Sequence, residues 1–190
     1  MFGVSTTPVR EAFTVLAQEG LVRQDAHRGV VVFAPSLAEL RETFEIRQAL
    51  EPLATTLAAE ALTDDDLAAL RRIVYEMGTA KPGRYYELNR MFHRRIYAAA
   101  NRDRLISLIE QMREVAARYL AMTARQYDPA YRERMQAEHE AILGALAERD
   151  GERAERLVQD HLRHGSEHIA TLLATDATRQ PGSTVGAGEA

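Results

Sequence analysis

The feature that most constrains this chain is the helical spacing of its apolar residues over most of its length. From Ser36 to about Ala174 the apolar side chains recur only every three or four residues, which is the pattern of one helix face. The pattern is interrupted at Pro52, 63–66, 78–83, Asn101, 128–129 and 150–151. Division at such points gives helices of about 15 to 25 residues. We therefore predict a mainly α fold containing an antiparallel six-helix bundle.

The bundle is expected to form a domain of its own over residues 35–174. Ser36 and Glu39 have the S-x-x-E spacing of a capping box and follow directly after Pro35. Hydrophobic residues make up 46% of the 190 positions, which is enough for a sizeable core. The segment 175–190 is polar and rich in glycine, so we predict a disordered tail there.

The composition excludes several classes of protein. Cysteine is absent, so disulfides and thiolate zinc ligands are excluded. The sequence begins without a basic and apolar leader and contains no run approaching the ~20 apolar residues of a membrane span. We therefore expect a cytoplasmic protein with no membrane partner. The net charge of −4 gives no electrostatic signal for nucleic acid, so a DNA-binding interpretation has to rest on a motif.

Residues 1–34 have a different pattern and are expected to form a small separate domain. Apolar residues at helical spacing follow Thr7 and Pro8, which suit the cap and first position of a helix, and Gly20 suits its end. Two β-rich runs, 21–24 and 30–33, then flank a polar segment, as in a hairpin. We predict a helix followed by a two-stranded wing.

The run GVSTTPVREAF at 3–13, followed by EGLV at 19–22 and HRG at 27–29, resembles the second half of the GntR-family winged helix-turn-helix. The resemblance implies a bacterial transcription regulator that places this helix in the major groove of its operator DNA, with the wing near the backbone or minor groove. The DNA-binding residues that it implies are Thr6, Thr7, Arg10, His27, Arg28 and Gly29. The family motif has further helices before this point, so the resemblance predicts a truncated motif and weak or absent operator binding.

Three histidines, His93, His139 and His161, lie on the apolar stripes of three different predicted helices. Asn89 lies one turn before His93 and shares its helix face. Inward-facing histidines of neighbouring helices can converge on one cation, and imidazole suits zinc, nickel and similar metals. The same pattern fits core histidines that each make one hydrogen bond. His164 and His168 are expected on a solvated face, with His164 as the substitute ligand if the last helix is rotated.

The segments NRMFH at 89–93, EHEAI at 138–142 and DHL at 160–162 resemble the metal-binding motifs of the FadR-type branch of the GntR family. The effector domain of that branch is the all-helical FCD domain. The resemblance implies a divalent metal, zinc or nickel, held by Asn89, His93, His139 and His161. Asn89 stands where aspartate is more usual. Because the four donors are then neutral, the metal keeps its full charge and attracts an anion.

Arg47 falls on the apolar stripe of the first bundle helix, where a buried guanidinium needs a partner. The resemblance of the segment EIRQALE at 45–51 to the family implies that the partner is a bound effector carboxylate, held by two hydrogen bonds. An internal salt bridge to Glu51, four residues on, or to a neighbouring helix fits equally well.

The function predicted from these features is a ligand-responsive transcription regulator. A small carboxylate or sugar acid would bind the metal and Arg47, shift the bundle between two packings and so move the paired wings of a homodimer on DNA. One alternative is a truncated effector-binding dimerisation module without DNA binding. The other is a metalloenzyme that uses the histidines. The sequence has no H-E-x-x-H motif, nucleophile elbow or phosphate loop, so we do not expect an enzyme.

Overall fold

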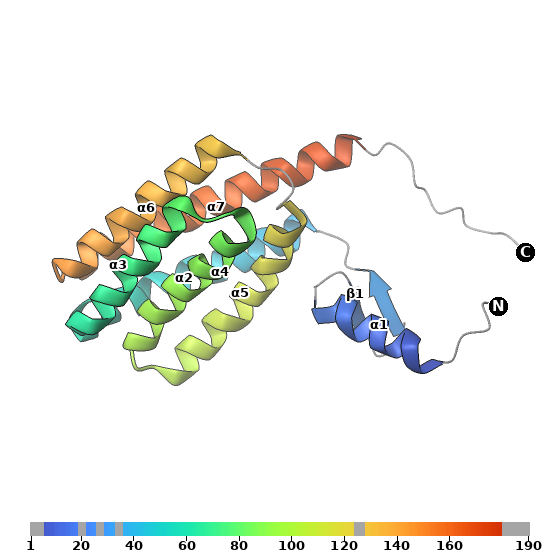
Figure 1. Ribbon diagram of the computed structural model, residues 1–190, viewed down its shortest axis with the longest axis horizontal. Coiled ribbons are helices and arrows are strands. Elements are labelled where there is room, and N and C mark those ends of the chain that lie inside the picture. Colours follow the sequence, from blue (N-terminus) through green and yellow to red (C-terminus); the bar gives the residue numbers. More distant parts are fainter. Residues whose placement is uncertain (1–5, 19–21, 26–28, 33–35, 124–127, 180–190) are drawn as a thin grey trace, which may run out of the picture.

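The structure is a computed structural model that describes residues 6–18, 22–25, 29–32, 36–123 and 128–179. The prediction of a mainly α fold is confirmed, since six helices follow a short N-terminal segment (Figure 1). These helices are α2 (Leu37–Ala61), α3 (Asp64–Thr79), α4 (Pro82–Ala99), α5 (Asp103–Thr123), α6 (Pro129–Ala147) and α7 (Gly151–Arg179). None of the described helices is both long and apolar enough to cross a membrane.

Helix ends occur where the sequence supplies capping groups. The Ser36 hydroxyl accepts a hydrogen bond from the Glu39 amide at the start of α2. Thr63 and Asp66 form a reciprocal capping box at the start of α3, and Asp128 caps α6. These caps satisfy amide groups that have no partner within the helix, which fixes the start of each element.

Two boundaries differ from those that the sequence suggests. Helix α2 continues through Pro52, because its buried residues, which include Ala54 and Ala58, pack against several other helices and outweigh one lost backbone hydrogen bond. Helix α7 continues to Arg179, beyond the expected boundary at 174, and the Thr175 hydroxyl donates back to the Thr171 carbonyl within it. The rest of the expected tail, 180–190, lies outside the described residues.

The core lies between the six helices, with α2 in contact with α4, α5, α6 and α7. Its fully buried side chains come from every one of these helices, for example Leu40, Leu70, Phe92, Ile109, Ile142 and Val158. Burying such a side chain contributes roughly 1.5–3 kcal/mol. The polar side chains described below are therefore held on a well-packed framework.

The N-terminal segment consists of helix α1 (Thr6–Gln18) and two antiparallel strands, β1 (Val22–Asp25) and β2 (Gly29–Val32), and Figure 1 shows it beside the bundle. Val22 pairs with Val32, and Gly29 has a φ of 73°, which glycine adopts without strain. Val9 and Val15 of α1 are 39% and 51% exposed. The apolar side of α1 is therefore only partly covered by the described residues.

Candidate functional site

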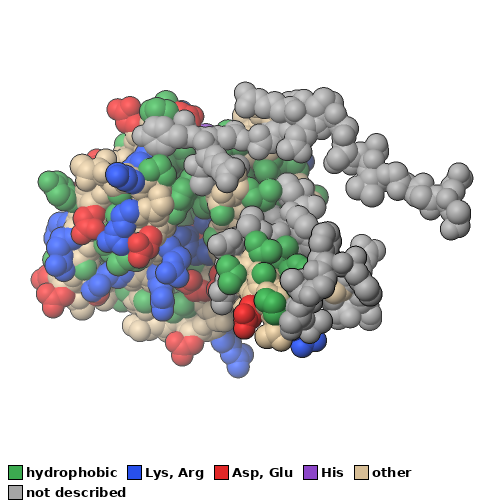
Figure 2. Space-filling model, turned by 45° about the vertical axis from the view of Figure 1, so that its right-hand side comes forward, with side chains coloured by type: hydrophobic (Ala, Val, Ile, Leu, Met, Phe, Trp, Pro, Cys, Tyr) green, Lys and Arg blue, Asp and Glu red, His purple; other side chains and the backbone are tan. Residues whose placement is uncertain are grey.

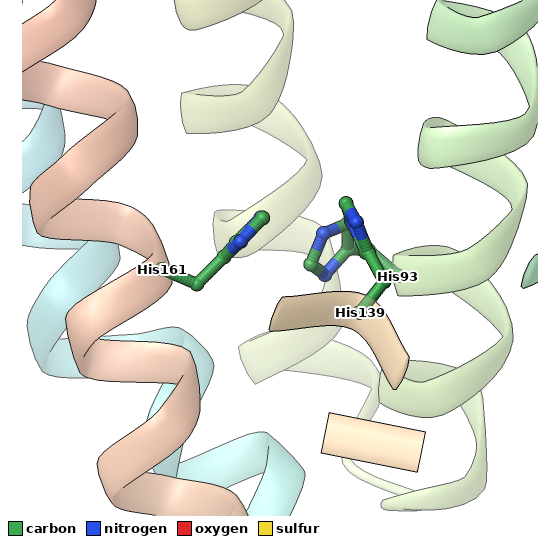
Figure 3. Close-up of side chains that lie close together, drawn as sticks. All are labelled: His93, His139 and His161. Atoms are coloured by element: carbon green, nitrogen blue, oxygen red, sulfur yellow. The ribbon is translucent and has the colours of Figure 1, made fainter. Parts of the chain in front are cut away.

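Three histidines from three helices converge in the bundle (Figure 3). His93 lies on α4, His139 on α6 and His161 on α7, and one ring nitrogen of each lies within 4.8 Å of the others. All three side chains are buried. The apolar stripes that carry them face the core, so packing of the three helices is what brings the rings together.

Each ring uses its Nδ1 atom to bond to the protein. His139 donates from Nδ1 to the Met135 carbonyl at 2.6 Å, and His161 donates from Nδ1 to the Glu138 carboxylate at 2.9 Å. A carbonyl or carboxylate oxygen can only accept, so Nδ1 of each ring carries a proton, which leaves Nε2 as the atom that can bind a metal. Metal-ligating histidines are commonly oriented in this way.

His93 is oriented by a longer chain of hydrogen bonds. Its Nδ1 lies 3.1 Å from the Tyr97 hydroxyl, which donates to the Glu51 carboxylate at 2.5 Å. Because the Tyr97 proton is used on Glu51, the Tyr97 oxygen accepts from His93 Nδ1–H. The lone pair of His93 is therefore also on Nε2, and all three rings have a free metal-ligand atom.

Asn89 meets this cluster at one point. Its Oδ1 atom lies 2.8 Å from His139 Nε2, so two lone pairs face each other. Two donors bound to one cation at right angles lie about 3 Å apart, which fits this contact. Turning the amide so that Nδ2 donates would also resolve the conflict. The contact is therefore compatible with a shared cation, and the structure brings Asn89 to the cluster of His93, His139 and His161 through His139.

Burial keeps two of the rings neutral. Burial is the main cause that lowers the pKa of His93 well below its usual value, and nearby Arg113 adds to it. Burial also lowers the pKa of His139 well below its usual value, with His161 the next contribution. Neutral imidazole is the form that binds a metal.

Arg47 forms the internal salt bridge that the sequence left as one possibility. Its Nε atom donates to Glu51 Oε1 at 2.7 Å, and its guanidinium lies over the Phe44 ring. Arg113 donates to Glu51 Oε2 at 3.1 Å. Burial raises the pKa of Glu51, but the two arginines and the hydrogen bond from Tyr97 together lower it by more, so the carboxylate is ionised. One fully buried carboxylate therefore serves two arginines, and the charge of Glu110 also acts on Arg113.

A cavity of about 90 Å³ adjoins both groups. Its walls include Arg47, Asn89 and all three histidines, together with apolar and aromatic residues of α2, α4, α6 and α7. Among the described residues, no hydrogen bond engages the terminal nitrogens of Arg47, which is only 7% exposed. Because a water needs about 10–15 Å³ on this scale, the space suits a small organic ligand.

Glu138, Tyr97 and Arg113 are functional candidates that the sequence analysis missed. Glu138 accepts from both His161 and His164, and although burial raises its pKa, these two bonds lower it by more. His164 is therefore a partner of this carboxylate and not a solvated residue. The spacing of Tyr97, four residues after His93, was the one available signal, because the other contacts join different helices.

Those of the sequence-predicted DNA-binding residues that the structure describes lie apart from this site. Thr6, Thr7 and Arg10 belong to the first two turns of α1, and Thr7 and Arg10 are exposed. Gly29 begins β2, whereas His27 and Arg28 lie outside the described residues. On the face shown in Figure 2, Lys and Arg side chains lie mainly over the bundle and are interspersed with acidic ones. On this face, charge alone therefore does not mark a DNA surface.

Comparisons with known proteins agree on one family. The FCD domain profile matches residues 42–164. The HTH-type transcriptional repressor RspR of Escherichia coli is 31% identical over 90% of this chain and 76% of its own length. The solved structure of E. coli McbR/YncC has a TM-score of 0.72 and 26% identity, covering 90% of this chain and 87% of that one. A GntR-family regulator from Pseudomonas syringae pv. tomato has a TM-score of 0.68 and 28% identity, covering 94% and 75%.

These relatives are described as transcription regulators, and the matched domain is an effector domain without catalytic function. The prediction that the chain is not an enzyme is confirmed on this ground. The chain belongs to the GntR family of transcription regulators, in the branch that carries an FCD domain.

Proposed function

We propose that the chain is a ligand-responsive regulator whose FCD domain binds a divalent metal, zinc or nickel, together with a small carboxylate or sugar acid. The observation that carries this proposal is the convergence of three buried imidazoles, each with Nδ1 bonded to protein, on the cavity that Arg47 also lines. Asn89 would be the fourth ligand through Oδ1.

The charges around the cavity favour an anionic effector, since Arg47 and Arg132 line it against one carboxylate, that of Asp128. The three imidazoles and the amide contribute no negative charge, and the Glu138 carboxylate meets this set only through His161, so a metal bound there would keep most of its charge and act as an electrophilic anchor for a carboxylate. Glu51 pairs with both Arg47 and Arg113, and Glu110 adds a second negative charge near Arg113. The terminal nitrogens of Arg47 can therefore hold a second carboxylate without leaving a buried anion unpaired.

Helix α2 provides a route from the cavity to the DNA-binding segment. Arg47 and Glu51 lie in its middle, and its start is tied to α5 because the Tyr119 hydroxyl donates to Glu39 at 2.6 Å. We infer that a ligand that draws Arg47 from Glu51 biases the packing of α2 and hence the segment preceding it. In a homodimer this would change the spacing of two DNA-binding units.

DNA contact is assigned to the first turns of α1, through Thr6, Thr7 and Arg10, and to the turn between the strands, through His27, Arg28 and Gly29. The exposure of Thr7 and Arg10 supports the α1 part of this assignment. Because the apolar side of α1 is partly uncovered, we expect this chain to hold the helix loosely and to bind its operator weakly.

The test is a thermal-shift screen of organic acids and sugar acids on tag-free protein, stripped with chelator and then loaded with zinc or nickel. A bound effector at a hundredfold excess over its Kd should stabilise the loaded protein by about 2.7 kcal/mol. Arg47→Met should lose this response, while Arg84→Met, which changes an exposed arginine outside the cavity, should keep it.

Stabilisation by acids that persists after complete chelation would show that the effector does not use the metal. An electrophoretic mobility shift assay on the gene's own upstream region, with and without the acid that stabilises the metal-loaded protein, then tests regulation. An acid that binds the metal-loaded protein without changing DNA affinity at any protein concentration would contradict the proposed coupling.

A further inference from the structure

Three tyrosines form a part of the cavity wall that the proposed metal and Arg47 do not use. Tyr85 and Tyr86 lie on α4, and Tyr131 lies on the first turn of α6. Tyr85 is only 8% exposed, and the other two are half-buried. They come from the same two helices as His93 and His139, so one cavity joins the tyrosines to the histidines.

The tyrosine rings are held in place by their neighbours. The Arg132 guanidinium lies 4.7 Å from the centre of the Tyr85 ring, and the Tyr86 ring packs edge-on against Tyr85 at 5.8 Å. Tyr131 stacks on His168 with ring centres 3.6 Å apart and planes within 5° of parallel. The hydroxyls are therefore presented by fixed rings, which lowers the entropy lost when a ligand binds them.

Within the part of the chain that the structure describes, the hydroxyls of these tyrosines make no hydrogen bond, and since they are not among its fully buried unpaired atoms, they keep access to water or a ligand. By contrast, the hydroxyls of Tyr97 and Tyr119, which also lie in the bundle, donate to carboxylates at 2.5 and 2.6 Å. The Tyr131 hydroxyl reaches across the cavity, since a Cβ atom at Gly165 of α7 would lie 3.7 Å from it. Burial raises the pKa of all three tyrosines, which keeps them protonated as donors.

These hydroxyls discriminate between kinds of acid. A ligand whose chain carries only C–H groups would remove water from the hydroxyls and leave them unpaired, which is unfavourable in a buried site. A ligand that carries hydroxyls would replace each water with a direct bond. A site that hydrogen-bonds a ligand hydroxyl strongly rejects a ligand that lacks this hydroxyl. An apolar pocket rejects a ligand with an added hydroxyl less strongly.

We propose that Tyr85, Tyr86 and Tyr131 form a hydroxyl-recognition subsite, so that the effector is a hydroxylated carboxylic acid and not an aliphatic or aromatic one. This inference rests on the proposed function, because it places the carboxylate at the metal and Arg47. The hydroxyl-bearing carbons then extend toward the three phenols, along the wall formed by α4 and α6.

The test is calorimetric titration of the metal-loaded protein with acids that differ only in hydroxyl number. Propionate, lactate and glycerate form one series, hexanoate and gluconate form a longer pair, and benzoate tests stacking. We expect the affinity to rise by about 3- to 10-fold for each hydroxyl that is bound. Tyr131→Phe and Tyr85→Phe should remove most of that gain for glycerate and gluconate and leave propionate unchanged.

Tyr75→Phe is the matched control, because Tyr75 is 81% exposed and lies outside the cavity. It should preserve the full preference for hydroxylated acids. Equal affinities within each series, or a preference that survives the Tyr→Phe changes, would overturn the subsite alone. Tighter binding of benzoate than of glycerate would overturn it in favour of a stacking surface. Failure of every acid to bind would overturn the proposed function and this inference with it.

Discussion

Glu51 is expected to be the polar side chain on which the stability of the bundle depends most. It is 0% exposed and accepts from Arg47 at 2.7 Å, Arg113 at 3.1 Å and Tyr97 at 2.5 Å. Glu51→Gln keeps the volume but removes the one negative charge between two buried arginines. Breaking a buried pair in this way costs about 3–5 kcal/mol. For a chain of this length that is a fall in Tm of roughly 6–20 °C.

Urea unfolding followed by far-ultraviolet circular dichroism measures this loss directly. Glu76→Gln is the control, because Glu76 pairs with Arg84 on the surface and its loss should leave the urea midpoint unchanged. The double variant Glu51→Gln with Arg113→Met should recover part of the loss, since one unpaired cation is removed. A loss below about 1 kcal/mol for Glu51→Gln would refute the view that this carboxylate neutralises the arginines.

Three further predictions concern the site. The pKa values of His93 and His139 are lowered in the folded state, so below pH 6.5 the unfolded chain binds more protons than the folded one. The free energy of unfolding of the metal-free protein should therefore fall by up to about 1.4 kcal/mol per pH unit for each ring as the pH falls from 6.5. A free energy of unfolding that does not change between pH 7 and pH 5 would contradict this. Asn89→Asp should tighten metal binding and weaken carboxylate binding, because the added charge reduces the attraction for an anion, and competition with a metal-sensitive dye measures the first effect. Gly165→Ala should stabilise α7 by about 0.5–1 kcal/mol, because glycine is less favourable than alanine within a helix. It should lower the affinity for the effector, since its methyl group would enter the cavity at 3.7 Å from the Tyr131 hydroxyl. An unchanged effector affinity would place the ligand elsewhere.

The positions of the helices could be predicted because their limits depend on local chemistry. The caps at Ser36, Thr63 and Asp128 are properties of short segments, and the sequence shows them. Pro52 was misleading because its effect depends on how firmly the surrounding helix is packed, which a local pattern does not contain.

The candidate site could be predicted only in part for the same reason. Histidines on apolar stripes indicate the direction of their side chains, so their convergence followed once the helices were packed. Glu51 could be named as a partner of Arg47 because the two lie four residues apart. The contacts of Arg113 with Glu51 and of Glu138 with His161 join different helices, and their partners depend on tertiary packing.

The metal content of the protein tests the central proposal most directly. Tag-free protein, loaded with zinc or nickel and dialysed exhaustively, should retain about one metal ion per chain by elemental analysis, as the proposed four-donor site requires. His139→Ala should retain none. His168→Ala changes a histidine that stacks on Tyr131 and is not in the donor set, so it should retain the wild-type amount. Equal metal content in wild type and His139→Ala, or none in either, would contradict the account and make the three histidines core residues.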